Sequence, residues 1–461
     1  MRDTTLVFNG VQGATGEYAL QGETLEGILQ AFDRQAARRR GSDRGVAFGV
    51  EPGRLASAGW GVVFPRDGDP AVRDALEPLI DHRRKQVSDE SRFRVLDGED
   101  GLLPGESKGD YLARQGVAPG PVRPEIMPYY LLLVGSPREI PFEVQYQLDA
   151  QHAVGRLSFD TPWEYSQYAE SVVAAEAGRC RRPRRTVLLA PRNPDDAATG
   201  LSSRYLVKPL FEGLSAVEDW RVDSLVGEGA AKAAFTSHLG GEETPALLFA
   251  ACHGLCFDAG DPLQRSFQGS LLCQDWPGPK AWHRAIPREH IFAGSDVASG
   301  ADVAGLVAFL FACYGAGTPR LDDFDRTVRG RTSVIAPEAV VSRLAQRLLG
   351  HPKGGALAVV GHVERAWSYS FLWRSTAHVA VFESALRGLL EGWTVGMSME
   401  FFAFRLAELG SELIHALDAR GAGREASEAL RLWAAHHDAR NYVVLGDPAV
   451  RLAVEEALDD G

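Results

Sequence analysis

Runs of four or more apolar residues recur along the chain after residue 128, and most are followed by a turn and then by a stretch with helical periodicity. Continuous apolar runs of this length are typical of strands that are buried on both faces of a sheet. They predict strands within residues 129–134, 185–190, 246–251, 306–311, 356–360 and 442–445. Buried strands that alternate with helices favour an α/β sandwich with a mainly parallel sheet.

Helical periodicity predicts helices at Leu25 to Arg39, around Ala71 to Gln86, and within DTPWEYSQYAESVVAAEAG, where Asp160 is the expected N-cap. The segment SMEFFAFRLAELGSELIHAL also has apolar residues near helical spacing, which predicts core-facing helices. Before residue 125 the chain is glycine-rich and irregular, and GWGVVFP is its one strand-like piece.

Composition divides the chain into three parts. Residues 1–125 form an N-terminal region of unknown role, residues 126–182 a small α/β subdomain, and residues 183–461 the main α/β domain. The boundary falls near Arg182, in the basic run RCRRPRR. We interpret this run as a linker between domains; the alternatives are a patch for an acidic partner and a site of self-cleavage.

Length and charge narrow the class of protein. The 461 residues are 45% hydrophobic, which is ordinary for a globular chain. The net charge of -12 disfavours binding to nucleic acid or to an anionic membrane surface. No secretion leader or membrane-spanning run is recognisable, and the five cysteines lack disulfide-scaffold spacing, so we expect a cytoplasmic protein with free thiols and no cofactor.

Two candidate catalytic residues follow buried strands. ALLFAACHG ends at His253 and Gly254, and GLVAFLFACYGAG presents Cys313 in a glycine-rich turn. Ligands of such sheets bind beyond the carboxyl ends of the strands, so both residues are expected at one edge. A thiol nucleophile needs a base and an oxyanion hole, which His253 and the amides of Gly254 and Cys313 would supply. The pair predicts a cysteine endopeptidase without a metal.

The same motifs resemble a known family. CHG, ACYGAG, VGSPREIPF, AVGRLSFDTPWEY and LGDPAVRL are similar to segments of the caspase-like clan CD of cysteine peptidases, particularly bacterial CHAT-domain proteins and the gingipain family, over about residues 125 to 455. The resemblance implies a caspase-like α/β/α sandwich for residues 183–461, with a smaller α/β subdomain before it. It also implies a protein substrate and allows a regulatory protein partner. Cys252 before the histidine and Tyr314 after the cysteine depart from the usual pattern.

Four further residues are candidates for substrate binding. In gingipain-like enzymes a strand similar to GGALAVVGHVERAWSYSF leads to a tryptophan that walls the specificity pocket, and Trp367 has a similar position. Glu364 is either solvated or pairs with an arginine or lysine of the substrate, which gives a weak preference for cutting after a basic residue. Asp195 and Asp196 would orient His253 or bind a substrate cation.

Other interpretations remain open or are disfavoured. The main alternative is a catalytically silent caspase-like scaffold or interaction module. A zinc site at Cys252, His253 and Cys256 is disfavoured because adjacent residues of a strand point to opposite faces. The chain has no G-x-S-x-G elbow of an α/β hydrolase. His436 and His437, and the acidic cluster at Asp322 and Asp323, are expected on the surface.

Overall fold

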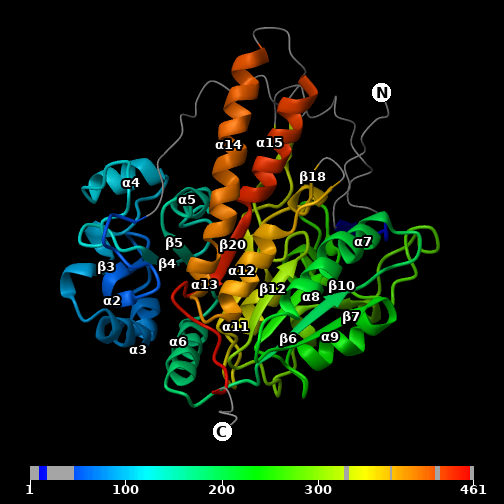
Figure 1. The fold of residues 1–461 in the computed structure, drawn as a ribbon, viewed down its shortest axis with the longest axis horizontal. Coiled ribbons are helices and arrows are strands. Elements are labelled where there is room, and N and C mark those ends of the chain that lie inside the picture. Colours follow the sequence, from blue (N-terminus) through cyan, green and yellow to red (C-terminus); the bar gives the residue numbers. More distant parts are fainter. Residues whose placement is uncertain (1–9, 18–45, 327–331, 374–375, 421–425, 457–461) are drawn as a thin grey trace.

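The computed structural model describes residues 10–17, 46–326, 332–373, 376–420 and 426–456 (Figure 1). The helix expected at Leu25 to Arg39 lies outside the described residues.

A ten-stranded sheet forms the centre of the molecule, in the order β3-β2-β4-β5-β20-β17-β12-β8-β6-β7. The strands are β2 (Trp60–Val63), β3 (Phe93–Leu96), β4 (Tyr130–Val134), β5 (Ala153–Leu157), β6 (Arg185–Ala190), β7 (Arg221–Val226), β8 (Leu247–Ala251), β12 (Val307–Phe311), β17 (Ala358–His362) and β20 (Tyr442–Gly446). Each predicted apolar run corresponds to one of these strands. The predicted α/β class with a mainly parallel sheet is confirmed.

One antiparallel junction divides this sheet. Neighbouring strands are parallel throughout, except that β17 and β20 pair antiparallel, with His362 opposite Tyr442. The first half-sheet (β3, β2, β4, β5, β20) therefore runs opposite to the second half-sheet (β17, β12, β8, β6, β7). The carboxyl ends of the two half-sheets consequently lie at opposite edges.

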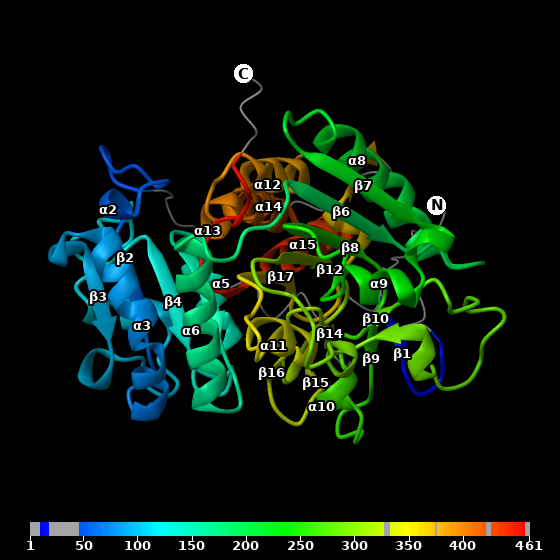
Figure 2. The same cartoon turned by 90° about the horizontal axis from the view of Figure 1, so that it is seen from below.

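Helices cover both faces of the second half-sheet. In Figure 2, α8 (Lys208–Leu214) and α12 (Ala380–Leu390) lie on one side of β6, β8 and β12, and α9 (Lys232–His238) and α11 (Arg343–Leu349) lie on the other. Phe382 of α12 packs its ring edge against the ring of Phe249 in β8. The short helices are α2 (Leu55–Ala58), α4 (Lys108–Arg114), α5 (Phe142–Leu148), α7 (Ala197–Ser202), α10 (Gln264–Phe267) and α13 (Val395–Ser398).

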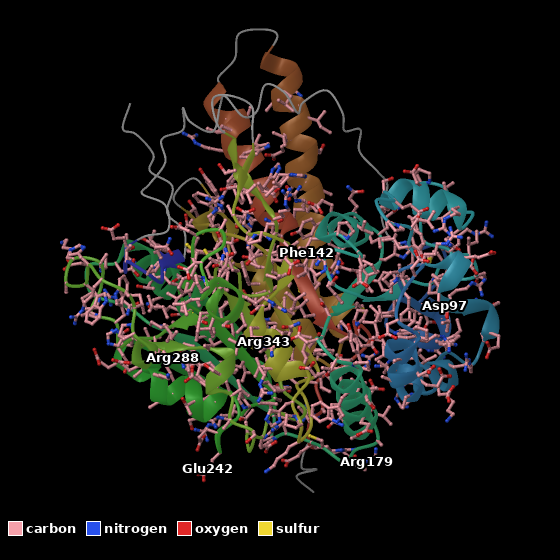
Figure 3. All side chains as sticks on the ribbon, turned by 180° about the vertical axis from the view of Figure 1, so that it is seen from behind. Asp97, Phe142, Arg179, Glu242, Arg288 and Arg343 are labelled. Carbon is pink, nitrogen blue, oxygen red and sulfur yellow. The ribbon has the colours of Figure 1, made fainter. Side chains whose placement is uncertain are left out.

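Helix α6 (Pro162–Glu176) begins one residue later than expected. Its N-cap is Thr161 rather than Asp160, because the Glu164 carboxylate accepts the Thr161 N–H at 3.0 Å in a capping box. Asp160 instead pairs with Arg343 of α11, labelled in Figure 3, at 2.5 Å.

The described part of the N-terminal region is more regular than expected. The predicted strand GWGVVFP is β2, and the predicted helix at Ala71 to Gln86 is α3 (Pro70–Val87), which packs against α6. Since β2 and β3 pair with each other and β2 pairs with β4, residues before 125 belong to the first half-sheet. The chain crosses to the second half-sheet through the basic run, where Arg182 pairs with Asp302 at 2.6 Å. The division into three parts stays a prediction.

A strand from the N-terminal region lies beside the candidate site. Strand β1 (Gly10–Gln12) pairs parallel with β9 (Gly254–Cys256), with Gly10 opposite Gly254. Strands β10 (Leu271–Leu272) and β11 (Ile291–Phe292) complete this four-stranded sheet. Val11 is fully buried in the apolar cluster beneath it. Three hairpin-like pairs make up the rest: β13 (Gly317–Thr318) with β16 (Val340–Val341), β14 (Leu321–Arg326) with β15 (Thr332–Val334), and β18 (Leu372–Trp373) with β19 (Thr376–Ala377).

Helices α14 (Glu400–Arg420) and α15 (Ala426–Arg440) pack against each other and project from the body (Figure 1). Leu409 and Leu413 of α14 are buried, as predicted, but Phe404 is 49% exposed because that part of α14 faces solvent. Within the described ranges, no helix combines the length and the hydropathy needed to cross a membrane.

Candidate active site

Strand register brings His253 and Cys313 to the same edge of the sheet. Strands β8 and β12 are parallel neighbours in which Ala251 lies opposite Phe311. The pairing continues one step further, since the Cys252 N–H donates to the Phe311 carbonyl at 3.2 Å. His253 and Cys313 follow at equivalent positions beyond the two strands. This is the edge that the sequence predicted for both.

The His253 side chain is held by an aspartate. Its Nε2 lies 2.8 Å from Oδ2 of Asp196, and both side chains are fully buried. Asp196 is itself fixed as the N-cap of α7, where it accepts the N–H groups of Ala198 and Thr199. A carboxylate only accepts hydrogen bonds, so Nε2 is the donor in this contact. The indole of Trp276 packs edge-on against the imidazole at 6.0 Å.

The Cys313 thiol is completely buried. Its Sγ accepts the Ala366 N–H at 3.3 Å. Burial raises the pKa of this thiol well above its usual range, although the hydrogen bond from Ala366 favours the thiolate. The described hydrogen bonds of Cys313 and His253 thus go to different partners, and burial disfavours the thiolate form of Cys313.

Close backbone contact explains the glycine after His253. A methyl group on Gly254 would stand 1.8 Å from the Cys313 carbonyl oxygen and 3.0 Å from its nitrogen. Only glycine fits so near the backbone that carries the thiol. The oxyanion hole expected from the two amides stays a prediction. Gly317, at the end of the glycine-rich turn after Cys313, pairs with Val341 of the chain itself.

Glu364 is not solvated, contrary to one of its two expected roles. It is fully buried, and its Oε1 accepts hydrogen bonds from Arg365 Nε and Nη2 at 3.0 and 2.8 Å. The same guanidinium pairs with Asp322, which is also buried rather than on the surface. The cause in both cases is the neutralising charge of Arg365, which sequence analysis missed. Burial lowers the pKa of Arg365, but Asp322 and Glu364 outweigh it and raise the pKa. Burial also raises the pKa of the Glu364 carboxyl well above its usual range, although Arg365 opposes this shift.

Trp367 packs inside the protein, at 2% exposure. Its ring lies 5.3 Å from that of Phe324, and its backbone N–H donates to Asp438 Oδ1 at 2.8 Å. Asp195 is apart from this group, paired with Lys280 at 2.8 Å on the surface. Of the four substrate candidates, only Asp196 contacts a catalytic candidate in the described interactions.

Asp438 is a second residue that sequence analysis missed. It lies fully buried on α15 and accepts hydrogen bonds from the Trp367 N–H and, at 2.5 Å, from the Ser370 hydroxyl. His437 beside it is buried as well, contrary to expectation, because its Nδ1 bonds the Trp433 carbonyl within the helix. Charged residues next to an apolar run, as in GHVERAW, are the sequence signal that could have indicated a buried polar cluster.

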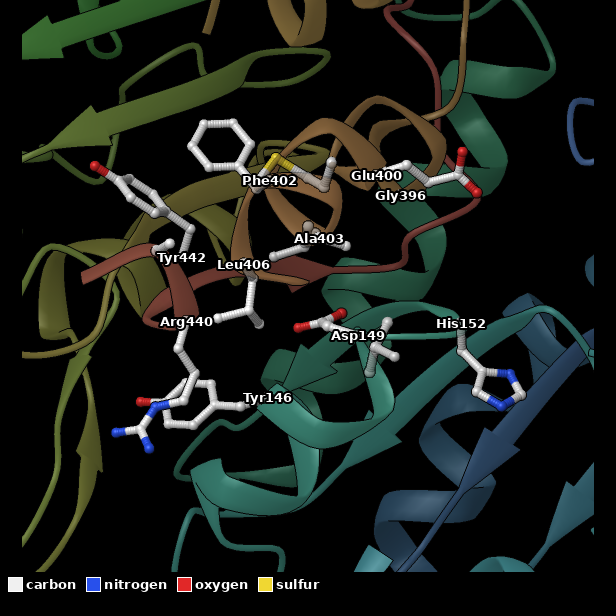
Figure 4. A pocket seen from close by; sticks show the side chains of 14 residues that line it. Tyr146, Asp149, His152, Gly396, Glu400, Phe402, Ala403, Leu406, Arg440 and Tyr442 are labelled. Carbon is white, nitrogen blue, oxygen red and sulfur yellow. The ribbon is translucent and has the colours of Figure 1, made fainter. Parts of the chain in front are cut away.

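The cavities near this edge do not expose the thiol. A small cavity of about 30 Å³ lies between α5 and α14 and is lined by Tyr146, Asp149, His152, Glu400 and Arg440 (Figure 4). Burial lowers the pKa of His152 there to about 4. A larger cavity of about 430 Å³ lies beside Phe142, which Figure 3 labels. Neither His253 nor Cys313 lines either cavity. In the described part of the chain, no three His, Cys, Asp or Glu side chains are grouped to hold a metal ion.

No protein-family model and no curated protein matches this sequence. Similar solved structures were found, and three of them are described below. The Arg-specific cysteine proteinase gingipain R is 11% identical, with 86% of this chain and 78% of that chain covered and a TM-score of 0.49. A structure described as a protease is 13% identical, with 86% and 79% covered and a TM-score of 0.45. The complex of Porphyromonas gingivalis RgpB pro- and mature domains is 13% identical, with 86% and 80% covered and a TM-score of 0.46.

Proposed function

We propose that this protein is a cysteine endopeptidase in which Cys313 is the nucleophile and His253 the general base. One observation carries the proposal: a histidine oriented by a buried aspartate stands at the strand position equivalent to that of a cysteine on the neighbouring strand. A nucleophile, a base and a group that orients the base are the parts that thiol catalysis requires. Asp196 fills the third role as a positioning residue.

In the proposed reaction His253 takes the proton of the Cys313 thiol, and the sulfur attacks the carbonyl carbon of a peptide bond. A C–S bond forms, the C–N bond breaks, and His253 returns the proton to the leaving amine. Water then hydrolyses the thioester and restores the thiol. The amides of Gly254 and Cys313, whose backbones are in contact, would stabilise the oxyanion.

The proposed substrate is a protein, cut with a weak preference after a basic residue. The support is that Glu364 and Asp322 already bind a guanidinium, that of Arg365, near the thiol. Two carboxylates arranged for one guanidinium favour arginine over an uncharged side chain. Trp367 and Asp195 would contribute only after rearrangement, since one is buried and the other is paired with Lys280.

The burial of the Cys313 thiol favours a second candidate, a catalytically silent module that binds a regulatory protein partner. Burial keeps the pKa of this thiol high, whereas a catalytic thiol needs a low one. In this candidate the α/β sheet is a scaffold, and His253 and Cys313 are structural.

Digestion of a peptide library, followed by mass spectrometry, tests the proposal. The wild-type protein should cleave peptides, and both Cys313→Ala and His253→Ala should abolish cleavage. Asp196→Asn should lower kcat by about 10²- to 10⁴-fold because the imidazole loses its orienting carboxylate. The matched control is Asp81→Asn, at an exposed aspartate of α3 that pairs with Arg84, and it should leave kcat unchanged. Cleavage that survives in Cys313→Ala would contradict the proposal.

A further inference from the structure

The loop that follows β17 closes over the thiol. Residues 363–367, named here the Glu364 loop, are bonded to the segment that carries Cys313. The Tyr314 N–H donates to the Glu364 carbonyl at 2.6 Å, the Glu364 N–H to the Gly317 carbonyl at 3.1 Å, and the Ala366 N–H to the Cys313 sulfur at 3.3 Å. The loop thus occupies the space directly at the nucleophile, where a substrate carbonyl has to enter.

Both sides of this contact have strained backbone. Tyr314 has φ of 59° and Glu364 has φ of 73°, a region that residues with a side chain rarely adopt. This backbone conformation is sparsely populated unless the surrounding structure enforces it. Residues that adopt it are often found in switch regions. The two strained residues are joined by the hydrogen bond from Tyr314 to Glu364. The closed arrangement therefore depends on an interaction that holds the Glu364 loop in place.

Arg365 supplies that interaction. Its side chain is 3% exposed and forms ion pairs with its neighbour Glu364 and with Asp322, which is distant in sequence. The guanidinium lies over the ring of Phe324 at 5.4 Å. Two carboxylates and an aromatic face make a complete guanidinium site, and the chain's own arginine fills it.

We propose that Arg365 is an autoinhibitory latch: its guanidinium, bound by Asp322 and Glu364, holds the Glu364 loop over Cys313, and its release exposes the thiol. The inference rests on the proposed peptidase function. A ligand opens the latch only if it binds the open state better. The chemistry that meets this condition is a competing guanidinium, from a substrate or a partner, which takes the place of Arg365 between the carboxylates.

Alkylation of the intact protein by iodoacetamide, read at Cys313 by mass spectrometry, measures the latch without peptidase activity. Arg365→Ala should raise the rate at Cys313 by about tenfold or more, because one partner of a buried ion pair is gone. Cys180, which is partly exposed elsewhere, is the reference thiol and should keep its rate. The matched control is Arg138→Ala, which removes an exposed arginine paired with Glu338.

Ethylguanidinium added to the wild-type protein should speed the alkylation of Cys313 in a concentration-dependent way and should have no such effect on Arg365→Ala. The small cation competes with Arg365 for the site between Asp322 and Glu364, whereas ethylammonium at equal ionic strength fits it poorly. If Arg365→Ala does not fold, the triple variant Arg365→Met, Glu364→Gln, Asp322→Asn removes the three buried charges together and should show the same rapid alkylation.

The outcomes separate the latch from the proposed function. Faster alkylation together with new peptide cleavage supports both. Faster alkylation with no cleavage in any variant keeps the latch and overturns the peptidase. An unchanged alkylation rate in folded Arg365→Ala and in the triple variant overturns the latch, and cleavage by the wild type then still supports the peptidase.

Discussion

In the part of the chain that the structure describes, Arg83 and Arg365 are each buried between two carboxylates, and they differ in what they hold. Arg83 of α3 is 1% exposed and bonds Asp447 at 2.7 Å and Glu176 at 2.7 Å. Arg365 is 3% exposed and bonds Asp322 and Glu364. The composition of the two clusters is the same: one guanidinium and two carboxylates.

The backbone around them is different. Arg83 and Glu176 lie within the regular helices α3 and α6, and Asp447 follows the central strand β20, so the cluster joins three segments that are distant in sequence. Arg365 bonds its own neighbour Glu364, which has a strained φ of 73°. A buried ion cluster whose residues lie on regular helices and strands is a structural clamp. A buried ion cluster whose residues lie on a strained loop is a candidate switch.

The largest effect is expected from Arg83→Ala. It leaves Asp447 buried without its cation, which should lower the free energy of unfolding by about 3–5 kcal/mol. Urea denaturation followed by circular dichroism measures this loss, and iodoacetamide labelling of Cys313 in the folded variant should be unchanged. Faster labelling of Cys313 would show that the Arg83 and Arg365 clusters are coupled, which would contradict their separate roles.

Acid should weaken the Arg83 cluster next. Burial opposes ionisation of Glu176, but Arg83 and hydrogen bonds from His82 and Gln86 outweigh it and lower the pKa from 4.5 to about 2. A carboxyl whose folded-state pKa is depressed stabilises the protein above about pH 4.5 and loses that contribution as the pH falls toward about 2. Its contribution is about 2 kcal/mol. Urea denaturation at several pH values should show that the free energy of unfolding depends less on pH in Glu176→Gln than in the wild type. An equal pH dependence in the two proteins would be inconsistent with an ion pair between Arg83 and Glu176.

Arg365→Ala should cost less than Arg83→Ala, about 2 kcal/mol, because release of the strained backbone at Tyr314 and Glu364 offsets part of the lost ion pair. The same urea denaturation compares the two variants directly. A loss as large as that of Arg83→Ala would mean that Arg365 is also a clamp, and the distinction between the clusters would fail.

The smallest effects are expected from two tyrosine-to-phenylalanine variants, Tyr168→Phe and Tyr442→Phe. The Tyr168 hydroxyl donates to the Leu357 carbonyl at 2.7 Å and accepts the Asp447 N–H at 2.6 Å, so its removal leaves two buried groups without this partner. The expected loss is about 1 kcal/mol. Tyr442→Phe is the counterpart near Asp438, and it should cost still less because Ser370 keeps its bond to Asp438. Thermal denaturation ranks the two, and the reverse order would contradict the stated hydrogen-bond roles.

The sequence predicted seven of the ten strands of the central sheet and the edge that carries the site, because long apolar runs indicate burial on both faces and parallel strands share their carboxyl edge. It missed β3, β5 and β7, whose segments include charged residues and have no long apolar run. It could not predict that β20 pairs antiparallel with β17, because a run of apolar residues does not distinguish parallel from antiparallel pairing. It also could not predict that β1 pairs with β9, because three residues carry too little pattern.

The charged residues were the least predictable part of the site. Glu364 and Asp322 have the local pattern of surface residues, and their burial depends on Arg365, which no spacing rule connects to Asp322. His253 and Asp196 were both named as candidates, but their contact depends on the N-terminus of α7 lying next to the end of β8. Non-local pairs of this kind become visible only in the folded structure.

The pairing of Gly10–Gln12 with Gly254–Cys256 has a practical consequence. Because β9 begins directly after His253, a substitution that breaks this pairing would alter the backbone next to the imidazole, so the first described segment of the chain is part of the support of the candidate base.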